Sequence, residues 1–491
     1  MPYFAMDNQF VAAPLPQDAP IEPGTNVSLD DDATFFDRDL IAGGSPWRLL
    51  RLRGASRPIA QSWKDGGVVE SGQELFARTL VTQGLLHPHF SPVDVSAETD
   101  VIIPVFQNVA ALTSLLAHLR GFYVTVVDDG SNNERGIAET VGSFGATLVR
   151  LDENSGPANA RNEGAARTNR TYLWFVDADV VLDEPSSTLA QLASNLSDPL
   201  VAAAAPRVVG SDDKGFFSSF ERRNSPLDLG NSRAIVVPGG RVSYVPSACL
   251  LVRRSAFGDG FDPSLRVGED VDFEWRLHDQ GWLLRYDPDV VVRHPARPSW
   301  KTWWQQRHDY GRSSGELAKR YGPRLTPVRV DASTLAIWLA IFLRRPRLAA
   351  RVLSVAHRGL VSQLPGTTEH PEKVARQIVG AGVLRTGGPL ARSIVRTYGP
   401  FVLLLSLHPK LRRRMLVLFG VGTLWRWRRS KSLHVQDIPF AVADDMAYAT
   451  GVWRGALRHR GWWAIRPNIS GTTRGLRALT GRDAKRPPLD D

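Results

Sequence analysis

Between residues 100 and 210 the chain alternates short apolar runs with longer segments in which apolar residues recur at helical spacing. Five runs predict strands: VIIPVF from Val101, YVTVVDD from Tyr123, ATLVRLD from Ala146, YLWFVDAD from Tyr172 and VAAAAPRVV from Val201. The segments that begin at Val109 and Ala158 predict two of the intervening helices. Repeated strand–helix units predict an α/β domain with a parallel sheet covered by helices.

A different pattern precedes this region. The segment NVSLDDDATFFDRDL predicts two short strands around an acidic turn, and helices are predicted over 46–52, 57–63 and 72–83. Residues 1–22 are rich in proline and polar side chains, which predicts a loose arm. We therefore expect three parts: a small α+β unit in residues 1–95, the α/β domain in 96–322 and a C-terminal extension in 323–491.

The C-terminal extension is predicted to be helical, with arginine-rich segments interrupted by proline and glycine. Its three apolar runs start at Ala332, Thr397 and Met415, and each has about 11 to 13 residues between charges. A helix that spans a bilayer needs about 20. The runs therefore predict buried helices. Helices that lie in a membrane interface are the alternative, because arginine clusters stand beside the runs.

The net charge of +10 over 491 residues is unevenly distributed. Residues 1–95 and 96–322 each have a net charge of −5, whereas 323–491 hold 29 basic and 9 acidic side chains, a net charge of +20. A basic segment can contact nucleic acid, an anionic membrane face or only solvent. Because the parts with recognisable chemistry are acidic, we expect no nucleic-acid partner and a basic surface that packs on the α/β domain and touches an anionic membrane.

Two features bear on the compartment. Cys249 is the lone cysteine, which excludes an intrachain disulfide and fits a reducing cytoplasm. The N-terminus lacks a basic region followed by a long apolar stretch, so a secretory signal is not expected. We expect a cytoplasmic protein that is peripheral on the inner face of the plasma membrane.

Carboxylates gather where the predicted strands end. Asp128 and Asp129 follow one strand directly and precede Gly-Ser, a pattern that is also typical of a plain turn. Asp177 and Asp179 follow another strand and share a face, because alternate side chains of an extended segment point the same way. A hard divalent cation bound by one or two carboxylates and substrate phosphates would offset their repulsion. A solvated acidic turn is the alternative.

Two predicted helices begin with polar side chains. Glu269 and Asp270 open the helix in GEDVDFEWRLHDQG, where the helix dipole favours acids and where a general base is the second interpretation. Asn159 and Arg161 lie at the start of the helix in GPANARNEGAAR, a position suited to anions and carboxylates. His294 ends a predicted strand, where a metal ligand could reach the same edge.

The succession VIIPVFQN, DDGS, GPANARN, DAD and GEDVDFEWRL resembles the family 2 glycosyltransferases, which have the GT-A fold of nucleotide-diphospho-sugar transferases. The resemblance implies that the nucleotide sugar is bound by Pro104, Asp128, Asp129, Asn159, Arg161 and Asp177. It implies that a divalent metal, Mn²⁺ or Mg²⁺, is held by Asp179, Asp177 and His294. It also implies that Asp270 is the general base and that Glu269 lies beside it.

The outer segments resemble the subgroup of this family that acts in mycofactocin biosynthesis. That resemblance implies an inverting enzyme that moves glucose from UDP-glucose onto a peptide-derived small-molecule redox cofactor and builds a β-linked chain. The N-terminal unit is similar to small winged-helix elements that recognise precursor peptides. The alternatives are a cell-envelope rhamnosyl- or glucosyltransferase with a lipid-linked acceptor and a catalytically silent peptide-binding scaffold. No tryptophan follows Arg307, which departs from the Gln-x-x-Arg-Trp motif of processive polysaccharide synthases.

Overall fold

The computed structural model describes residues 19–37, 39–211, 216–297, 299–364, 366, 368–427 and 434–470. Most of the predicted N-terminal arm, residues 1–18, lies outside the described residues. The described residues form two compact units. The first comprises residues up to 31, 44–46 and 58–297, and the second comprises 32–43, 47–57 and those from 299 onward.

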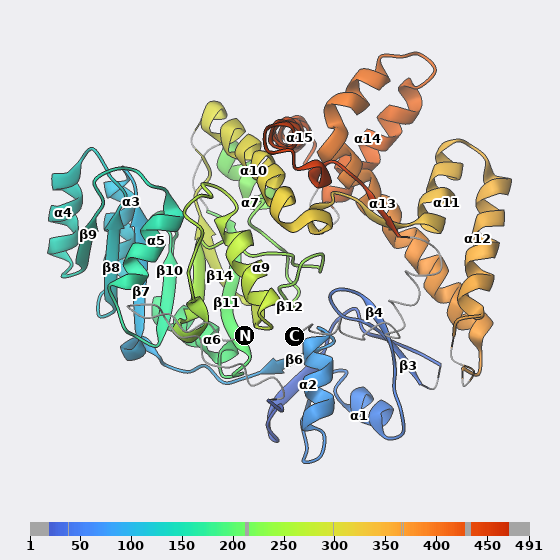
Figure 1. Ribbon diagram of the computed structural model, residues 1–491, viewed down its shortest axis with the longest axis horizontal. Coiled ribbons are helices and arrows are strands. Elements are labelled where there is room, and N and C mark those ends of the chain that lie inside the picture. The colour runs from blue at the N-terminus through green and yellow to red at the C-terminus, as the bar shows by residue number, and fades with distance from the viewer. Residues whose placement is uncertain are drawn as a thin grey trace, which may run out of the picture. The chain divides into compact units, whose positions relative to one another are not determined.

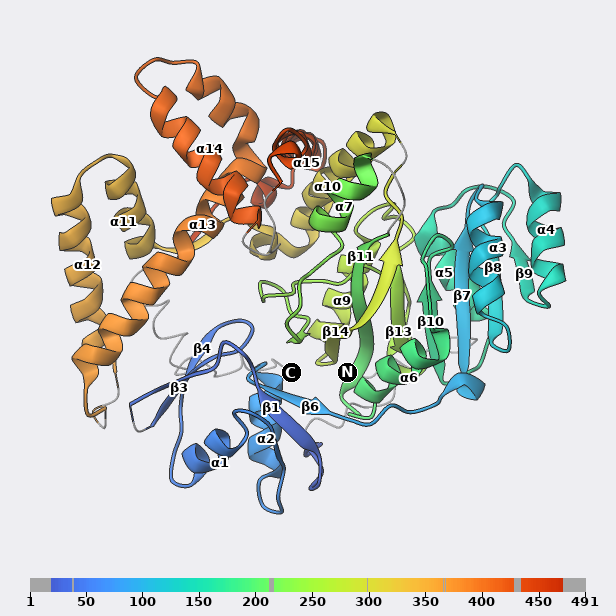
Figure 2. The ribbon, with the colours of Figure 1, turned by 180° about the vertical axis from the view of Figure 1, so that it is seen from behind.

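The first unit is built around an eight-stranded sheet with the order β12-β14-β11-β13-β10-β7-β8-β9 (Figures 1 and 2). The bounds are Thr99–Val105 for β7, Tyr123–Asp128 for β8, Thr147–Arg150 for β9, Tyr172–Val176 for β10, Val201–Gly210 for β11, Ala234–Ile235 for β12, Cys249–Arg253 for β13 and Leu283–His294 for β14. Strands β7 to β11 confirm the five predicted strands.

Six of these strands run in one direction. Strand β7 is parallel to β8 and β10, β8 is parallel to β9, and β11 is parallel to β14. Strand β13 is antiparallel to both β10 and β11, and β12 is antiparallel to β14. The five predicted strands are therefore parallel, as expected, and the antiparallel β12 and β13 are strands that the sequence analysis did not predict. Two successive antiparallel pairings restore the strand direction, so β11 and β14 end at the same edge as β7, β8 and β10.

Close packing of helices on this sheet fixes the start of α5. The helices of the first unit are α3 (Val109–His118), α4 (Glu134–Ser143), α5 (Pro157–Ala166), α6 (Pro185–Asn195), α7 (Phe216–Asn224), α8 (Arg254–Phe257) and α9 (Glu269–Asp279). A Cβ added at Gly164 of α5 would lie 2.4 Å from Cγ2 of Ile102 on β7. Only glycine lets α5 lie this close to the strand, which sets the position of the residues one turn earlier.

The N-terminal part of the first unit contains a second, smaller sheet with the order β5-β1-β6. Its elements are β1 (Asn26–Leu29), α1 (Ser56–Ser62), β5 (Gly67–Val68), α2 (Glu74–Thr82) and β6 (Leu86–His89). Two hydrogen bonds of 2.8 and 2.9 Å join the buried guanidinium of Arg78 on α2 to the carboxylate of Asp198. This ion pair fixes α2 to the turn before β11.

Residues 46–52 differ from the predicted helix. They contain β4 (Arg48–Arg51), which pairs with β3 (Leu40–Gly43), and β3 pairs in turn with β2 (Thr34–Phe36). The side chain of Leu49 is buried with Leu40 and with Val374 of the helical region, while Arg48 is exposed. Burial on one face of a small sheet therefore overrides the helical pattern of this short segment.

Helices make up most of the second unit. They are α10 (Trp300–Tyr321), α11 (Ala332–Phe342), α12 (Pro346–Val361), α13 (Pro371–Ser406), α14 (Arg412–Trp427) and α15 (Ile438–His459), with a parallel pair of strands, β15 (Arg329–Asp331) and β16 (Asn468–Ser470). In the described part of the chain no helix has both the length and the apolarity needed to cross a membrane.

The three apolar runs of the C-terminal extension lie in α11, α13 and α14, which confirms that they are helical. Their predicted burial is wrong for many side chains: Leu339, Leu404 and Val417 are 52%, 63% and 64% exposed. These helices bury only the face that packs on their neighbours. The prediction failed because a helical hairpin has too few neighbours to cover an apolar run on every side.

Glycines allow α10 and α15 to cross at very short range. A Cβ added at Gly451 of α15 would lie 2.0 Å from the carbonyl oxygen of His308 on α10. A Cβ at Gly315 of α10 would lie 2.1 Å from the backbone of Gly455. Both helices carry these glycines four residues apart, on one face. The two backbones therefore touch with no side chain between them.

Buried charges also connect these helices. The carboxylate of Asp444 on α15 lies 2.7 Å from Nε of Arg307 on α10 and 2.6 Å from Nη1 of Arg426 on α14. Its neighbour Asp445 pairs with Arg392 of α13. The side chain of Arg307 is fully buried. Arg307 stands where the synthase motif has its arginine, although no tryptophan follows it here. In this chain Arg307 holds α10, α14 and α15 together through the buried ion pairs.

We predict that Gly451→Ala lowers the free energy of unfolding by about 1–3 kcal/mol, because the added methyl group overlaps the backbone of α10. Gly380→Ala in α13 is the matched control, since open space surrounds its Cβ position. There alanine should stabilise the helix by up to about 1 kcal/mol. Chemical denaturation followed by circular dichroism measures both. Equal effects at the two positions would contradict the close crossing.

Candidate active site

The predicted site residues meet at the edge where the parallel strands end. Asp128 is the last residue of β8, Asp177 directly follows β10, and His294 is the last residue of β14. The N–H of Asp177 donates to the carbonyl of Ala248, just before β13, at 2.9 Å. Sheet topology thus brings together side chains that are more than 160 positions apart in the sequence.

The first two aspartates hold the loops of this edge in place. Asp128 is fully buried, accepts the N–H of Ser131 at 3.0 Å and pairs with Arg150 at the end of β9. The carboxylate of Asp129 accepts two backbone N–H groups, those of Ser155 at 2.8 Å and Gly156 at 2.9 Å. Asp129 therefore ties the tip of β8 to the loop that leads into α5.

Arg161 bridges two carboxylates from different elements. Its Nη2 donates to Oδ1 of Asp177 at 2.7 Å, and its Nη1 donates to Oε1 of Glu269, the first residue of α9, at 2.9 Å. The guanidinium is 3% exposed. Burial alone would lower the pKa of Arg161, but Asp177 and Glu269 outweigh burial and raise it above its usual range. The guanidinium therefore stays charged and fastens α9 to the tip of β10.

A second pair lies beside this bridge. Nε2 of His294 is 3.3 Å from Oδ1 of Asp179, and Nη1 of Arg297 is 3.7 Å from its Oδ2. Burial would raise the pKa of Asp179, but the contacts with His294 and Arg297 lower it. Nδ1 of His294 is 2.9 Å from the carbonyl oxygen of Pro295. The carbonyl oxygen can only accept, so Nδ1 donates to it. Burial would lower the pKa of His294, but the hydrogen bond to Asp179 and its charge raise that pKa, so Nε2 donates to Asp179. A metal ion held by both residues would replace the Nε2 proton.

The donor set near Asp179 is compatible with a divalent cation. The described residues contain no group of three histidine, cysteine or acidic side chains that could hold a metal by themselves. Mg²⁺ and Mn²⁺ sites in phosphate-transferring enzymes commonly use one or two protein ligands and complete the shell with substrate phosphate and water. One carboxylate and one imidazole at the strand ends are sufficient for such a site.

Two further carboxyls lie on α9. Asp270 is half-buried, and burial followed by repulsion from Glu269 raises its pKa to about 7. One turn later Glu274 is 1% exposed, and burial raises its pKa well above the usual range. Its Oε2 accepts the N–H of Val245 at 2.9 Å. A carboxyl with a pKa near neutrality at this edge suits proton transfer.

A glycine makes this arrangement possible. Gly268 precedes α9 with φ of +88°, a left-handed conformation that other residues rarely adopt. The chain therefore turns sharply into the helix and places Glu269 against Arg161. The helix N-terminus also stabilises acidic side chains in its first turn.

The last two predicted residues also lie at this edge. Pro104 is the penultimate residue of β7 and lies in register with Val127 of β8. Asn159 is half-buried in the first turn of α5, and its side chain forms no hydrogen bond with the described residues. Its amide is thus available to a ligand. The roles of these two residues in binding stay predictions.

The sequence analysis missed Arg150, Arg297 and Glu274. The position of Arg150 could have been inferred from the sequence. It ends β9, the strand that follows β8 in the chain, and neighbouring parallel strands end at the same edge, so Arg150 lies beside Asp128. Glu274 follows Asp270 by four positions, so it shares a helix face with that residue. Arg297 lies in an irregular segment after β14, where no periodicity marks it.

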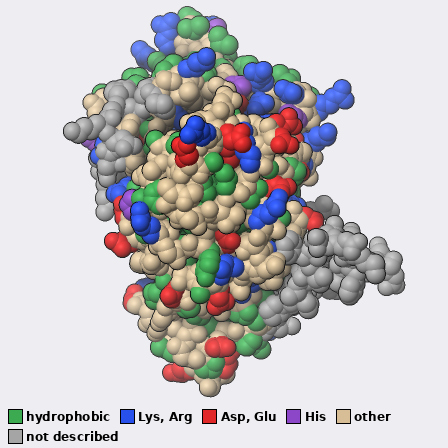
Figure 3. All heavy atoms as spheres, turned by 90° about the vertical axis from the view of Figure 1, so that its left-hand side faces the viewer, with side chains coloured by type: hydrophobic (Ala, Val, Ile, Leu, Met, Phe, Trp, Pro, Cys, Tyr) green, Lys and Arg blue, Asp and Glu red, His purple; other side chains and the backbone are tan. Residues whose placement is uncertain are grey.

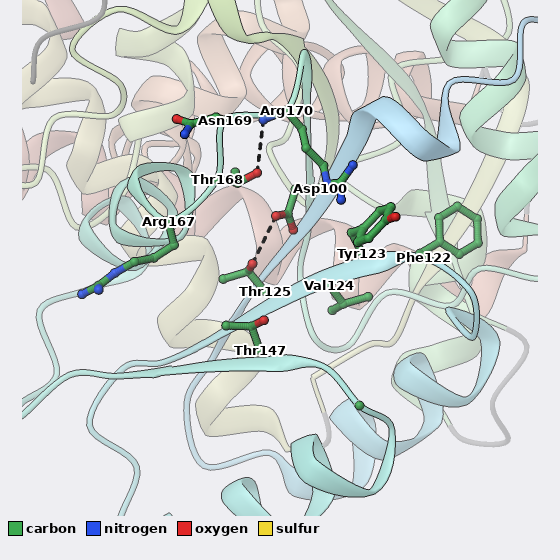
Figure 4. Close-up of a pocket in the computed structure, with 11 residues that line it drawn as sticks. Asp100, Phe122, Tyr123, Val124, Thr125, Thr147, Arg167, Thr168, Asn169 and Arg170 are labelled. Atoms are coloured by element: carbon green, nitrogen blue, oxygen red, sulfur yellow. Dashed lines mark hydrogen bonds between the residues drawn. The ribbon is translucent and has the colours of Figure 1, made fainter.

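The hollow drawn in Figure 4 belongs to the opposite edge of the sheet. It has a volume of about 550 Å³ and is lined by Asp100, Tyr123, Thr125 and Arg170, among others. Asp100 and Tyr123 are at the amino ends of β7 and β8. Thr125 donates to Asp100 at 3.3 Å there. Because the paired carboxylates lie at the carboxyl ends, this hollow is not the candidate active site.

Residues 100–261 match the family described as Glycosyl transferase family 2. The pre-mycofactocin glycosyltransferase of Mycobacterium tuberculosis is 32% identical over 449 residues, which are 88% of this chain and 95% of that protein. The chain therefore belongs to the family 2 glycosyltransferases. Its α/β sheet, with carboxylates at the strand ends, is the GT-A domain that the sequence predicts.

The match to the pre-mycofactocin glycosyltransferase extends over more of the chain than the match to a second curated relative. The poly-beta-1,6-N-acetyl-D-glucosamine synthase of Staphylococcus aureus is 24% identical over 229 residues, which are 45% of this chain and 53% of that protein. Among solved structures, the mannosyltransferase PcManGT of Pyrobaculum calidifontis, in complex with GDP-Man and Mn²⁺, has 17% identity and a TM-score of 0.37, and covers 72% of this chain and 94% of its own. The pre-mycofactocin enzyme also shares most of the outer segments.

We predict that Arg161→Met lowers the free energy of unfolding by about 3–5 kcal/mol, because it leaves Asp177 and Glu269 close together without the cation between them. Arg135→Met is the control: its side chain is 90% exposed beside Glu139 on α4. Its cost should stay below about 1 kcal/mol. Chemical denaturation measures both values. A small cost at Arg161 would show that the bridge carries little of the structure.

Proposed function

We propose that this chain is an inverting, metal-dependent glycosyltransferase that moves glucose from UDP-glucose to the peptide-derived precursor of mycofactocin and extends a β-linked chain. The observation that supports the chemistry is the position of two unlike groups at one edge: the Asp179–His294 pair and the Asp270 carboxyl. The similarity to the pre-mycofactocin enzyme over 95% of its length supports the acceptor.

The proposed reaction is one in-line displacement. Asp270 takes the proton of the acceptor hydroxyl as its oxygen bonds to the anomeric carbon, and the bond from that carbon to the diphosphate breaks. Attack from the face opposite the leaving group inverts the configuration, so an α-linked donor gives a β-linked product. UDP leaves with the electron pair of the broken bond.

The other residues are proposed to hold the donor. Pro104, Asp128, Asp129, Asn159, Arg161 and Asp177 would form the nucleotide-sugar pocket. Asp179 and His294, with Asp177 nearby, would hold Mn²⁺ or Mg²⁺. When bound, such a cation neutralises the negative charge that develops on the diphosphate. Arg161 keeps Glu269 paired, which limits the repulsion that Glu269 exerts on Asp270.

Two assignments concern the outer parts. We propose that residues 1–95 recognise the precursor peptide and that 96–322 form the catalytic domain. A lipid-linked acceptor in the cell envelope is the second candidate substrate. The observation that favours it is the set of apolar side chains exposed on the helices of 323–491.

The product and its pH dependence test the proposal together. Purified enzyme with UDP-glucose, Mn²⁺ and the aglycone should give products heavier by whole hexose units, and Asp270→Asn should reduce kcat about 100-fold or more. A general base works when deprotonated. With the pKa of Asp270 raised to about 7, kcat/KM should therefore fall as the pH drops below 7 and level off above it. No hexose product, with either acceptor class, would contradict the proposal.

The metal assignment has its own test. His294→Gln should raise the Mn²⁺ concentration needed for half-maximal activity by about tenfold or more, because one ligand is lost. His118→Gln, at an exposed position of α3, is the matched control and should leave the titration unchanged. A metal titration of His294→Gln that coincides with that of the parent would remove His294 from the site.

A further inference from the structure

Two helical hairpins of the second unit expose leucines at their turns. The turn between α11 and α12 contains Leu343, which is 41% exposed, and Leu348 follows at 45%. At the turn between α13 and α14, Leu404 and Leu407 are 63% and 70% exposed. Figures 1 and 2 show that both turns point toward the same end of the helical unit. Clustered exposed leucines of this kind mark a contact surface.

The charges beside these leucines have one sign. Residues 332–361 contain five arginines and no acidic residue. Residues 398–427 contain Lys410 and four arginines, again without an acidic residue. Arg344, Arg345, Arg412 and Arg413 are exposed at the two turns. At the top of Figure 3, where the α13–α14 turn lies, basic and hydrophobic side chains gather.

This combination matches one partner better than others. A self-association surface made of these turns would bring like charges together, which costs free energy. An anionic bilayer supplies phosphates for the guanidinium groups and an acyl layer for the leucines. No helix in the described part of the chain is both long and apolar enough to cross a membrane, so we consider contact with the bilayer interface.

We propose that the two turns, residues 343–348 and 404–413, form a docking surface for an anionic lipid bilayer. The leucines enter the boundary between head groups and acyl chains, and the arginines pair with lipid phosphates. This surface is independent of the acceptor, so it applies to an enzyme that acts on a soluble precursor and to one that acts on a lipid-linked sugar.

Sedimentation with vesicles tests the charge requirement. The full chain should sediment with vesicles made of equal parts phosphatidylglycerol and phosphatidylcholine, and much less with phosphatidylcholine alone. Arg344→Glu/Arg413→Glu should weaken binding about tenfold or more. Lys64→Glu/Arg135→Glu changes the net charge by the same amount at exposed positions elsewhere, and it should bind like the parent. Equal losses in the two double variants would overturn the proposal.

A fluorescent label tests insertion of the leucines. The native Cys249 is fully buried, and burial raises the pKa of its thiol to about 12, so it should resist labelling. An environment-sensitive dye attached after Leu407→Cys should shift to the blue on anionic vesicles. The same dye after Leu75→Cys, at a 64% exposed position of α2, should not shift. No shift at position 407 would contradict insertion.

Self-association is the competing outcome, and it has a separate readout. Sedimentation velocity without lipid should show a monomer for the parent and for Leu404→Gln/Leu407→Gln. The same variant should lose vesicle binding while keeping glucosyl transfer to a soluble acceptor. A parent dimer that this variant dissociates would assign the leucines to a protein interface and overturn the proposal.

Discussion

The buried guanidinium of Arg161 is the interaction on which the candidate active site depends. It joins Asp177, at the tip of β10, to Glu269, at the start of α9. The guanidinium is 3% exposed and offsets the charges of both carboxylates, which would otherwise repel each other. It therefore fixes the helix that carries Asp270. A packing constraint places it there, because Gly164 lets α5 lie directly on β7.

The acidic residues at this edge divide into two groups. Asp128 and Asp129 use their oxygens on backbone N–H groups and on Arg150, so they set the shape of the loops. Among the described residues, Asp179 and Asp270 make no such contacts with the loops: the first contacts His294 and Arg297, which lower its pKa, and the second has its pKa raised toward neutrality by burial and by Glu269. Chemistry is therefore proposed for these two residues, an ionised carboxylate for the metal and a carboxyl with a near-neutral pKa for proton transfer.

Much of this arrangement follows from the sequence. The runs that form β7 to β11 are short and largely apolar, and those of β8 and β10 lead directly into Asp128 and Asp177, so both the strands and the edge that gathers these two residues could be predicted. The antiparallel β13 could not be predicted, because its apolar pattern resembles that of a buried parallel strand. The pairing of Arg161 with Glu269 could not be predicted either, because Glu269 lies 108 positions away in the sequence and only the fold brings it close. Exposure of Leu404 depends on how few helices surround it, which periodicity does not encode.

The coupling between Arg161 and Glu269 tests the central claim most directly. In Arg161→Met, the unpaired Glu269 carboxylate should raise the pKa of Asp270 further and lower kcat/KM at neutral pH. Adding Glu269→Gln removes that charge, so the double variant should regain activity by about tenfold, a coupling of about 1.4 kcal/mol. If the two single losses simply multiply in the double variant, Arg161 does not act through Glu269, and the account of this site is wrong.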